Sequence, residues 1–106
     1  MSFHLSGAEF RIEDNHILRA RLANEHGEHV DAEIDLDQFV GNSDGSFEWG
    51  SSGFSSSAEN VSFQIEGGGQ VPVLRASLRN VDGEFVERDL NLSERVENRN
   101  GQFVYV

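Results

Sequence analysis

The chain has 106 residues, a net charge of −11 and no cysteine. This length suits one compact domain, and the acidic balance disfavours nucleic acid and anionic membranes as partners. The lack of cysteine excludes disulfides and thiolate zinc sites. The N-terminal residues show neither the basic start nor the apolar run of a secretory signal, so we expect a cytoplasmic protein.

The first half of the chain predicts short strands and tight turns. Residues 17–22, ILRARL, alternate apolar and basic side chains, as a half-buried strand does. A polar turn at 24–28 with a glycine leads to a second alternating run at 30–34. Residues 35–40, DLDQFV, begin with an aspartate that can cap a single helical turn. The pattern is typical of an all-β protein.

Further turn signals follow these elements. The Asp-Gly pair at 44–45 predicts a tight hairpin that leads into an aromatic strand at 47–49. Residues 50–57, GSSGFSSS, are expected to be a flexible linker because of their composition. A glycine-rich turn at 66–70 separates two further predicted strands.

An internal repeat organises these elements. Shifting the sequence by 56 positions aligns residues 17–50 with 73–106 without a gap, and 13 of the 34 aligned positions are identical. Chance is a poor explanation for this agreement, so the chain contains two copies of one β-unit. The identical residues, numbered in the first copy, are Leu18, Arg19, Ala20, Leu22, Asn24, Gly27, Glu28, Val30, Leu36, Val40, Asn42, Gly45 and Phe47.

The two copies end in IDLDQFVGNSDGSFEWGSSGF (34–54) and LNLSERVENRNGQFVY (90–105). These segments resemble the cyanovirin-N homology lectins, whose repeats end in I-D/N-L followed by N-x-D-G-x-L/F-x-W/Y. The resemblance covers essentially the whole chain. It implies an all-β, pseudo-two-fold symmetric fold of triple-stranded sheets and β-hairpins with short helical turns, in which the repeats exchange strands. The single domain, 1–106, would comprise half A (1–39 plus 95–106) and half B (40–94).

The family pattern includes one disulfide in each half. The resemblance places Ala8 and Leu22 at one cysteine pair, and Ala58 and Leu78 at the other. A small and a large apolar side chain together can fill the same space by packing. Ser51 occupies the hinge position that can carry proline, so we expect a monomer, with a domain-swapped dimer left open.

The resemblance also implies a non-catalytic lectin with up to two pockets, without a cofactor or metal ion. The expected partners are mannose-type oligosaccharides or glycoproteins. Turn residues suit neutral sugars because hydroxyls both donate and accept hydrogen bonds. The half-B pocket would comprise Gly41, Asn42, Ser43, Asp44, Ser52, Gly53, Ser56, Ser57, Arg79, Asn80, Val81 and Asp82. The half-A pocket would comprise His4, Ser6, Gly7, Ala23, Asn24, Glu25, His26, Glu97, Asn98, Arg99 and Asn100.

Half B departs from the family pattern at three positions. Gly41 stands where Glu is typical, Gly53 stands for Asn, and Ser56 for Glu. Losing three hydrogen bonds of about 0.5–1.5 kcal/mol each would weaken binding by roughly tenfold or more. The alternative is therefore a protein-interaction module that keeps the fold, has lost sugar binding and selects a basic partner through its acidic surface.

Ordinary turn chemistry explains part of this set. Asn42 and Asn98 are expected to bond mainly to the neighbouring backbone. The better ligand candidates have less structural reason for their positions, and they are Ser52, Ser56, Asn80 and Asp82. Phe54, alone among serines, could belong either to the core or to a sugar-stacking surface.

Two other kinds of site can be considered. GNSDG (41–45) matches the G-x-S-x-G nucleophile elbow, but that motif requires a helix after the serine, and a strand is predicted here. His26 and His29, with carboxylates nearby, could form an adventitious zinc or nickel site. Neither pattern is repeated in the second copy, so we expect neither a nucleophile nor a metal centre.

Overall fold

The computed structural model describes residues 3–68 and 71–106. The strands are β1 (Gly7–Glu13), β2 (Ile17–Ala23), β3 (His29–Asp35), β4 (Val40–Ser43), β5 (Ser46–Trp49), β6 (Ala58–Glu66), β7 (Val71–Arg79), β8 (Phe85–Asn91), β9 (Val96–Arg99) and β10 (Gln102–Tyr105). Single 3-10 turns are η1 (Phe3–Leu5), η2 (Leu36–Gln38), η3 (Phe54–Ser57) and η4 (Leu92–Glu94). In the described part of the chain, no helix is long and apolar enough to cross a membrane.

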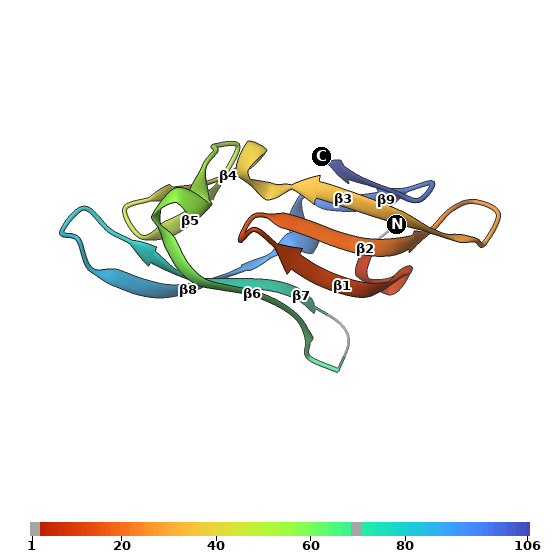
Figure 1. The fold of residues 1–106 in the computed structure, drawn as a ribbon, viewed down its shortest axis with the longest axis horizontal. Helices are drawn as coiled ribbons and strands as arrows, with labels where there is room; N and C mark the ends of the chain where they lie inside the picture. Colours follow the sequence, from red (N-terminus) through yellow and green to blue (C-terminus); the bar gives the residue numbers. More distant parts are fainter. Residues whose placement is uncertain (1–2, 69–70) are drawn as a thin grey trace.

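The strands form two triple-stranded antiparallel sheets and two hairpins. The first sheet has the order β1-β2-β3, the second β6-β7-β8, and the hairpins pair β4 with β5 and β9 with β10. The molecule is elongated, with extents of 50 × 27 × 21 Å. Hairpin β9–β10 packs beside β3, and hairpin β4–β5 packs beside β8 (Figure 1).

Each hairpin therefore packs on the sheet of the other copy. The hairpin of the first copy contacts the second sheet, and that of the second copy contacts the first sheet. This confirms the all-β, pseudo-symmetric fold with strand exchange between the repeats. The boundaries expected for the two halves, 1–39 plus 95–106 and 40–94, stay a prediction.

Equivalent strands have equivalent registers in the two sheets. Leu22 pairs with Val30 in the first sheet, and Leu78 pairs with Val86 in the second. Alternate residues of β2, and of β7 from Leu74 onward, are buried, and the arginines between them face outward, as the period-two pattern predicts. One continuous core joins both sheets, made of Phe3, Leu18, Ala20, Leu22, Ile34, Leu36, Val40, Phe54, Leu74, Ala76, Leu78, Leu90, Leu92 and Val96.

The predicted turn chemistry is confirmed. Asp44 and Gly45 have φ values of +49° and +83°, and Asn100 and Gly101 have +51° and +83°. A two-residue hairpin turn of this kind needs positive φ at both positions, which Asp, Asn and Gly tolerate best. Both single helical turns are also present, because η2 is capped by the Asp35 carboxylate and η4 by the Asn91 amide oxygen. Of the predicted glycine-rich turn, residues 69 and 70 lie outside the described residues.

The expectation that Ala8 packs with Leu22 in place of a disulfide is wrong. Gly7 pairs with Leu22, while Ala8 pairs with Arg21. Ala58 does pair with Leu78, as predicted. Gly7 and Ala58 are therefore equivalent, which makes the offset between the copies 51 positions here, rather than 56. The difference arises because β6 and β7 are each two residues longer than β1 and β2, and the connection between them is one residue longer. A β-carbon on Gly7 would lie 2.7 Å from Leu22 Cδ2, so the leucine fills this space.

The prediction of a flexible linker at 50–57 is also wrong. Phe54 has no exposed surface, and its ring packs edge-on against Phe47 at 5.8 Å between centroids. The Ser55 amide and hydroxyl both donate to the Asp37 carboxylate, at 3.0 and 2.5 Å. The serine-rich composition of this segment predicted flexibility, but the buried Phe54 side chain fixes the segment to the core. Phe54 is thus a core residue and not a sugar-stacking surface.

Candidate functional site

Asn98 joins three segments of the chain at the end of the first sheet. Its amide nitrogen donates to Ser6 Oγ at 2.8 Å and to the Ala23 carbonyl at 2.9 Å. Its amide oxygen accepts from the Gly101 backbone at 2.9 Å. Asn98 is 6% exposed, so these three bonds satisfy a nearly buried amide. We name the surface around it, formed by His4, Ser6, Gly7, Ala23–His26 and Glu97–Gly101, cluster A.

Asn42 forms the equivalent network on the second sheet. Its amide nitrogen donates to Ser57 Oγ and to the Arg79 carbonyl, both at 2.8 Å, and its oxygen accepts from the Gly45 backbone at 2.8 Å. The surrounding surface, formed by Gly41–Gly45, Ser52, Gly53, Ser56, Ser57 and Arg79–Asp82, is named cluster B. The structure thus brings the segments of each predicted pocket together, and it gives Asn42 and Asn98 the structural role expected from turn chemistry.

A second bond fastens each hairpin turn to the neighbouring sheet turn. Asp44 Oδ1 accepts from the Val81 amide at 2.9 Å, and Asn100 Oδ1 accepts from the Glu25 amide at 2.9 Å. Asn80 uses its own oxygen within the β7–β8 turn, where it accepts from the amides of Asp82 and Glu84. This oxygen is already engaged, which weakens Asn80 as a ligand candidate.

Cluster B retains polar side chains that can accept a ligand. Ser52, Asp82 and Arg79 are exposed, and among the described residues they make no side-chain hydrogen bond. Ser56 donates to the Gly53 carbonyl at 2.9 Å, so its hydroxyl is partly used within η3. Val81 is 82% exposed and places an apolar side chain at the edge of the cluster.

The glycine at position 41 has a local physical cause. Gly41 is buried, and a β-carbon there would collide with the Ser51 side chain and lie 3.0 Å from the Ser52 nitrogen. A glutamate at this position would require segment 51–52 to move. In contrast, the space next to Gly53 is open. The two departures from the family pattern therefore have different consequences for the shape of cluster B.

Cluster A holds several of its polar side chains in exposed contacts with one another. Arg99 pairs with Glu97 at 3.6 Å, and His26 lies 3.8 Å from a Glu25 carboxylate oxygen. Exposed pairs at these distances contribute little to the free energy of folding, so their displacement by a ligand costs little free energy. The half-buried His4 ring packs edge-on against Phe3. Gly7 lies within β1 next to Leu22, where it serves packing.

Sequence reasoning overlooked the two turn glycines as part of the clusters. The Gly45 and Gly101 amides close the Asn networks, and the spacing N-x-x-G occurs in both copies. Similarly, Ser6 and Ser57, the equivalent serines that accept from Asn98 and Asn42, each follow a buried phenylalanine at the spacing F-x-x-S. These phenylalanines are Phe3 and Phe54. Both short patterns would have located the anchors of the clusters.

One group of side chains has the composition of a metal site. In residues 3–68 and 71–106, the group of three His, Asp or Glu side chains close enough to share an ion is His16, Asp35 and Asp37. His16 Nδ1 lies 2.7 Å from Asp35 Oδ1, which is a hydrogen-bond distance, whereas tetrahedral zinc ligands lie roughly 3.3 Å apart. The hydrogen bond to Asp35 raises the pKa of His16. The group is arranged as an ion pair rather than as a ligand set.

The segment that matches a nucleophile elbow has the wrong context. Ser43 ends β4, and after a two-residue turn the chain continues as strand β5. A nucleophile elbow needs a helix there, whose N-terminus and backbone amides support the reaction. The match is accidental, as the aromatic pattern predicted.

Comparisons with known proteins agree with this geometry. The family model described as the CVNH domain matches residues 3–104. A cyanovirin-N homolog of Neurospora crassa is 51% identical over 107 residues, which cover 97% of this chain and 96% of that protein. The solved structure of the CVNH protein of Gibberella zeae has 47% identity, covers 97% of this chain and 95% of that chain, and superimposes with a TM-score of 0.88.

Two more distant structures share the fold. A microvirin–mannobiose complex has 23% identity and a TM-score of 0.86, covering 99% of this chain and 98% of that one. A MoCVNH3 variant in complex with (N-GlcNAc)4 has 22% identity and a TM-score of 0.83, covering 98% and 96%. With its Asn-anchored repeats, exchanged hairpins and a family match over nearly its whole length, the chain belongs to the cyanovirin-N homology family.

Proposed function

We propose that this protein is a lectin that binds mannose-type oligosaccharides through clusters A and B. The observation that carries the proposal is the duplicated Asn network, which fixes two surfaces of turn residues at equivalent places on the two sheets. A neutral sugar needs rigidly held donors and acceptors, because its hydroxyls bind only slightly better to protein than to water. Relatives of the same fold in complex with mannobiose and with (N-GlcNAc)4 support a carbohydrate ligand.

In cluster B, the groups that would contact the sugar are Ser52, Asp82 and Arg79. Their side chains are exposed and form no side-chain hydrogen bond among the described residues. In contrast, the amide nitrogen and oxygen of Asn42 both form hydrogen bonds within the protein. In cluster A, Glu97 and Arg99 would exchange their exposed ion pair for sugar hydroxyls. The two clusters on one body would add avidity toward a branched oligosaccharide.

A heteronuclear NMR titration with mannobiose tests the proposal. We expect saturable shifts of backbone amides within cluster A, cluster B or both, at millimolar sugar. Ser52→Ala and Asp82→Ala should each weaken binding at cluster B roughly two- to tenfold, the loss of one hydrogen bond. Ser46→Ala, a matched exposed serine outside the clusters, should leave the affinity unchanged.

A parallel titration with (N-GlcNAc)4 separates sugar classes. Stronger binding of this ligand than of mannobiose would contradict the mannose assignment while keeping carbohydrate binding. The absence of shifts with either sugar would contradict the lectin proposal itself.

A further inference from the structure

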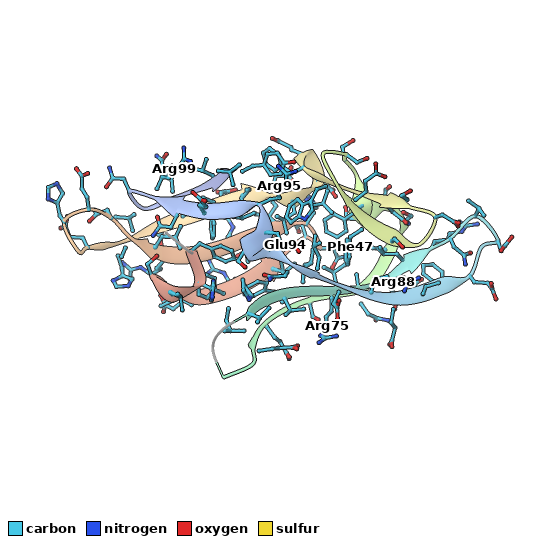
Figure 2. The ribbon with its side chains drawn as sticks, turned by 180° about the vertical axis from the view of Figure 1, so that it is seen from behind. Phe47, Arg75, Arg88, Glu94, Arg95 and Arg99 are labelled. Atoms are coloured by element: carbon cyan, nitrogen blue, oxygen red, sulfur yellow. The ribbon has the colours of Figure 1, made fainter. Side chains whose placement is uncertain are left out.

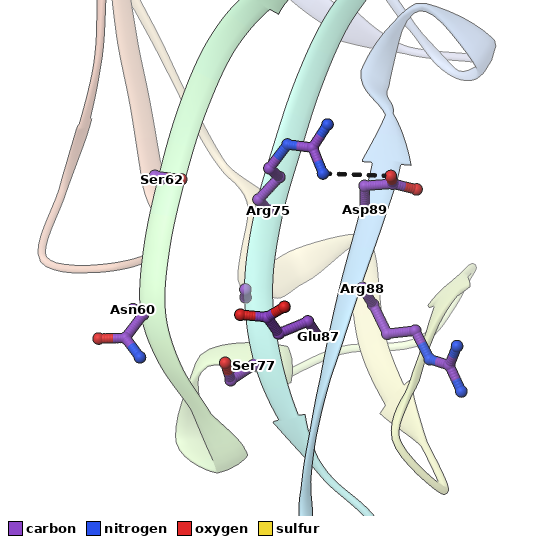
Figure 3. Close-up of a pocket in the computed structure, with 8 residues that line it drawn as sticks. Asn60, Ser62, Arg75, Ser77, Glu87, Arg88 and Asp89 are labelled. Atoms are coloured by element: carbon purple, nitrogen blue, oxygen red, sulfur yellow. Dashed lines mark hydrogen bonds and ion pairs between the residues drawn. The ribbon is translucent and has the colours of Figure 1, made fainter.

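A surface groove lies away from both clusters, on the outer face of the second sheet. Its volume is about 560 Å³, and it is lined by Asn60, Ser62, Arg75, Ala76, Ser77, Glu87, Arg88 and Asp89. None of these residues belongs to cluster A or cluster B. Figure 3 shows that the groove crosses all three strands, with Ser62 on β6, Ser77 on β7 and Glu87 on β8.

The first sheet shows what fills the equivalent space. Arg21 and Asp31 are paired across β2 and β3, just as Ser77 and Glu87 are paired across β7 and β8. Arg11 likewise occupies the position of Ser62, since each is paired with the outward arginine of the central strand. The first sheet thus carries two arginines where the second sheet carries two serines. The hollow on this face of the first sheet, lined by Ala8, Glu9, Arg21 and His29, has a smaller volume of about 300 Å³.

Arg21 defines a set of contacts for a guanidinium. Its Nη2 donates to the His29 carbonyl at 2.9 Å, and its Nε lies 3.7 Å from Asp31 Oδ1 and 3.9 Å from Glu9 Oε2. In the second sheet the corresponding positions are the Phe85 carbonyl, Glu87 and Asn60. All three are acceptors, and a serine replaces the arginine that would use them.

The charges around the groove leave one carboxylate available. Arg75 is held by Glu66 at 2.7 Å and by Asp89 at 3.4 Å. Arg88 extends to the other side of β8, where its Nε donates to the Gly45 carbonyl at 2.9 Å (Figures 2 and 3). Glu87 forms no ion pair with any residue of the described part of the chain. The counterpart of Arg75 in the first sheet, Arg19, coexists with Arg21, so an additional guanidinium is compatible with this arrangement.

We propose that the groove is a docking site for an arginine side chain of a peptide or protein partner, which occupies the position that Arg21 occupies on the first sheet. The guanidinium would pair with Glu87 and donate to the Phe85 carbonyl, while Ser62, Ser77 and Asn60 provide polar contacts. The net charge of −11 favours the approach of a basic partner. Because the groove is open to solvent, a single arginine should bind weakly, and a tight complex would need further contacts.

The test uses acetyl-arginine amide, in which both ends are blocked and the guanidinium is the one charged group. Acetyl-citrulline amide serves as its neutral isostere. In an NMR titration at low salt, we expect saturable shifts at Ser62, Ser77 and Glu87 with the arginine compound and none with citrulline. The shifts should weaken as salt is added. Free arginine that binds more tightly than the blocked compound would show an amino-acid site and would overturn the assignment to a peptide partner.

Three variants make the test specific. Ser77→Arg restores the arginine of the first sheet, and it should abolish the shifts because the protein then fills its own groove. Glu87→Gln should weaken binding at least threefold, and Asp31→Asn, the matched change on the first sheet, should have no effect. Should Ser77→Arg fail to fold, the comparison of Glu87→Gln with Asp31→Asn decides alone. Equal shifts in all variants, or equal shifts with citrulline, would overturn the proposal.

Discussion

Asn98 holds Ala23, 75 residues away along the chain, through a 2.9 Å hydrogen bond from its amide nitrogen to the Ala23 carbonyl. The bond ties the hairpin of the second copy to the first sheet, and it is one of three that the buried amide makes. The strand exchange between the repeats is therefore stabilised by a polar contact as well as by the shared core.

Replacement of Asn98 by Ala should destabilise the protein by about 1–3 kcal/mol, because it leaves buried backbone groups without partners. Asn42→Ala should cost less, since the Asn42 side chain is only half-buried. Urea denaturation measures both free energies of unfolding. Ser43→Ala, an exposed neighbour, should change stability by no more than about 0.5 kcal/mol. Equal effects of the three substitutions would contradict the role assigned to the Asn networks.

Gly101→Ala should be more costly than Gly27→Ala. Both glycines have positive φ, +83° and +79°, so each alanine suffers the same backbone strain of about 1–2 kcal/mol. A β-carbon on Gly101 would also lie 2.5 Å from Val30 Cγ2, whereas one on Gly27 meets nothing within 4 Å. The difference between the two losses of thermal stability isolates the packing of hairpin β9–β10 on β3. A Gly27→Ala variant as unstable as Gly101→Ala would argue against this close approach.

The repeat made much of this fold predictable from sequence. Strands β2 to β5 and β7 to β10 follow from the alternation and from the Asp-Gly and Asn-Gly turns. The register of β1 could not be predicted, because β6 and β7 are longer than β1 and β2, so the offset between the copies changes across the first hairpin of each sheet. Both β1 and β6 contain a bulge, with Glu9 and Asn60 at positive φ. No local sequence pattern predicts a glutamate with positive φ.

The sites were predicted less completely than the fold. The segments of each cluster could be identified from turn residues, but which side chains remain uncommitted depends on bonds between residues far apart in sequence. Asn80 and Ser56 look free in the sequence, and the folded chain engages both. The groove on the second sheet went unrecognised, because a hollow made by Ser62 and Ser77 is visible only when the outer faces of the two sheets are compared.

The stability contributed by His16 should depend on pH. The hydrogen bond to Asp35, with the nearby Asp37 and Asp14 charges, raises the pKa of His16 in the folded protein. A raised folded-state pKa means that the contribution is fully present below the unfolded-state value, about 6.5, and is lost as pH rises through the folded-state value. Thermal unfolding of the protein and of His16→Gln should therefore differ most in mild acid and converge in mild alkali. A difference that grows with pH would contradict this sign.

Phe54→Ala tests whether segment 50–57 is anchored. The phenyl ring has no exposed surface and packs against Phe47, so its removal should cost about 3–5 kcal/mol. A flexible linker would instead tolerate the change within about 0.5 kcal/mol. Phe3→Ala removes the equivalent ring, which packs against Phe103 at 5.4 Å, and serves as the matched comparison. Since η3 carries Ser57, the partner of Asn42, Phe54→Ala should also perturb the NMR signals of cluster B, while Phe3→Ala should perturb those of cluster A. Signals that change in the same cluster for both variants would contradict the symmetric anchoring of the two sites.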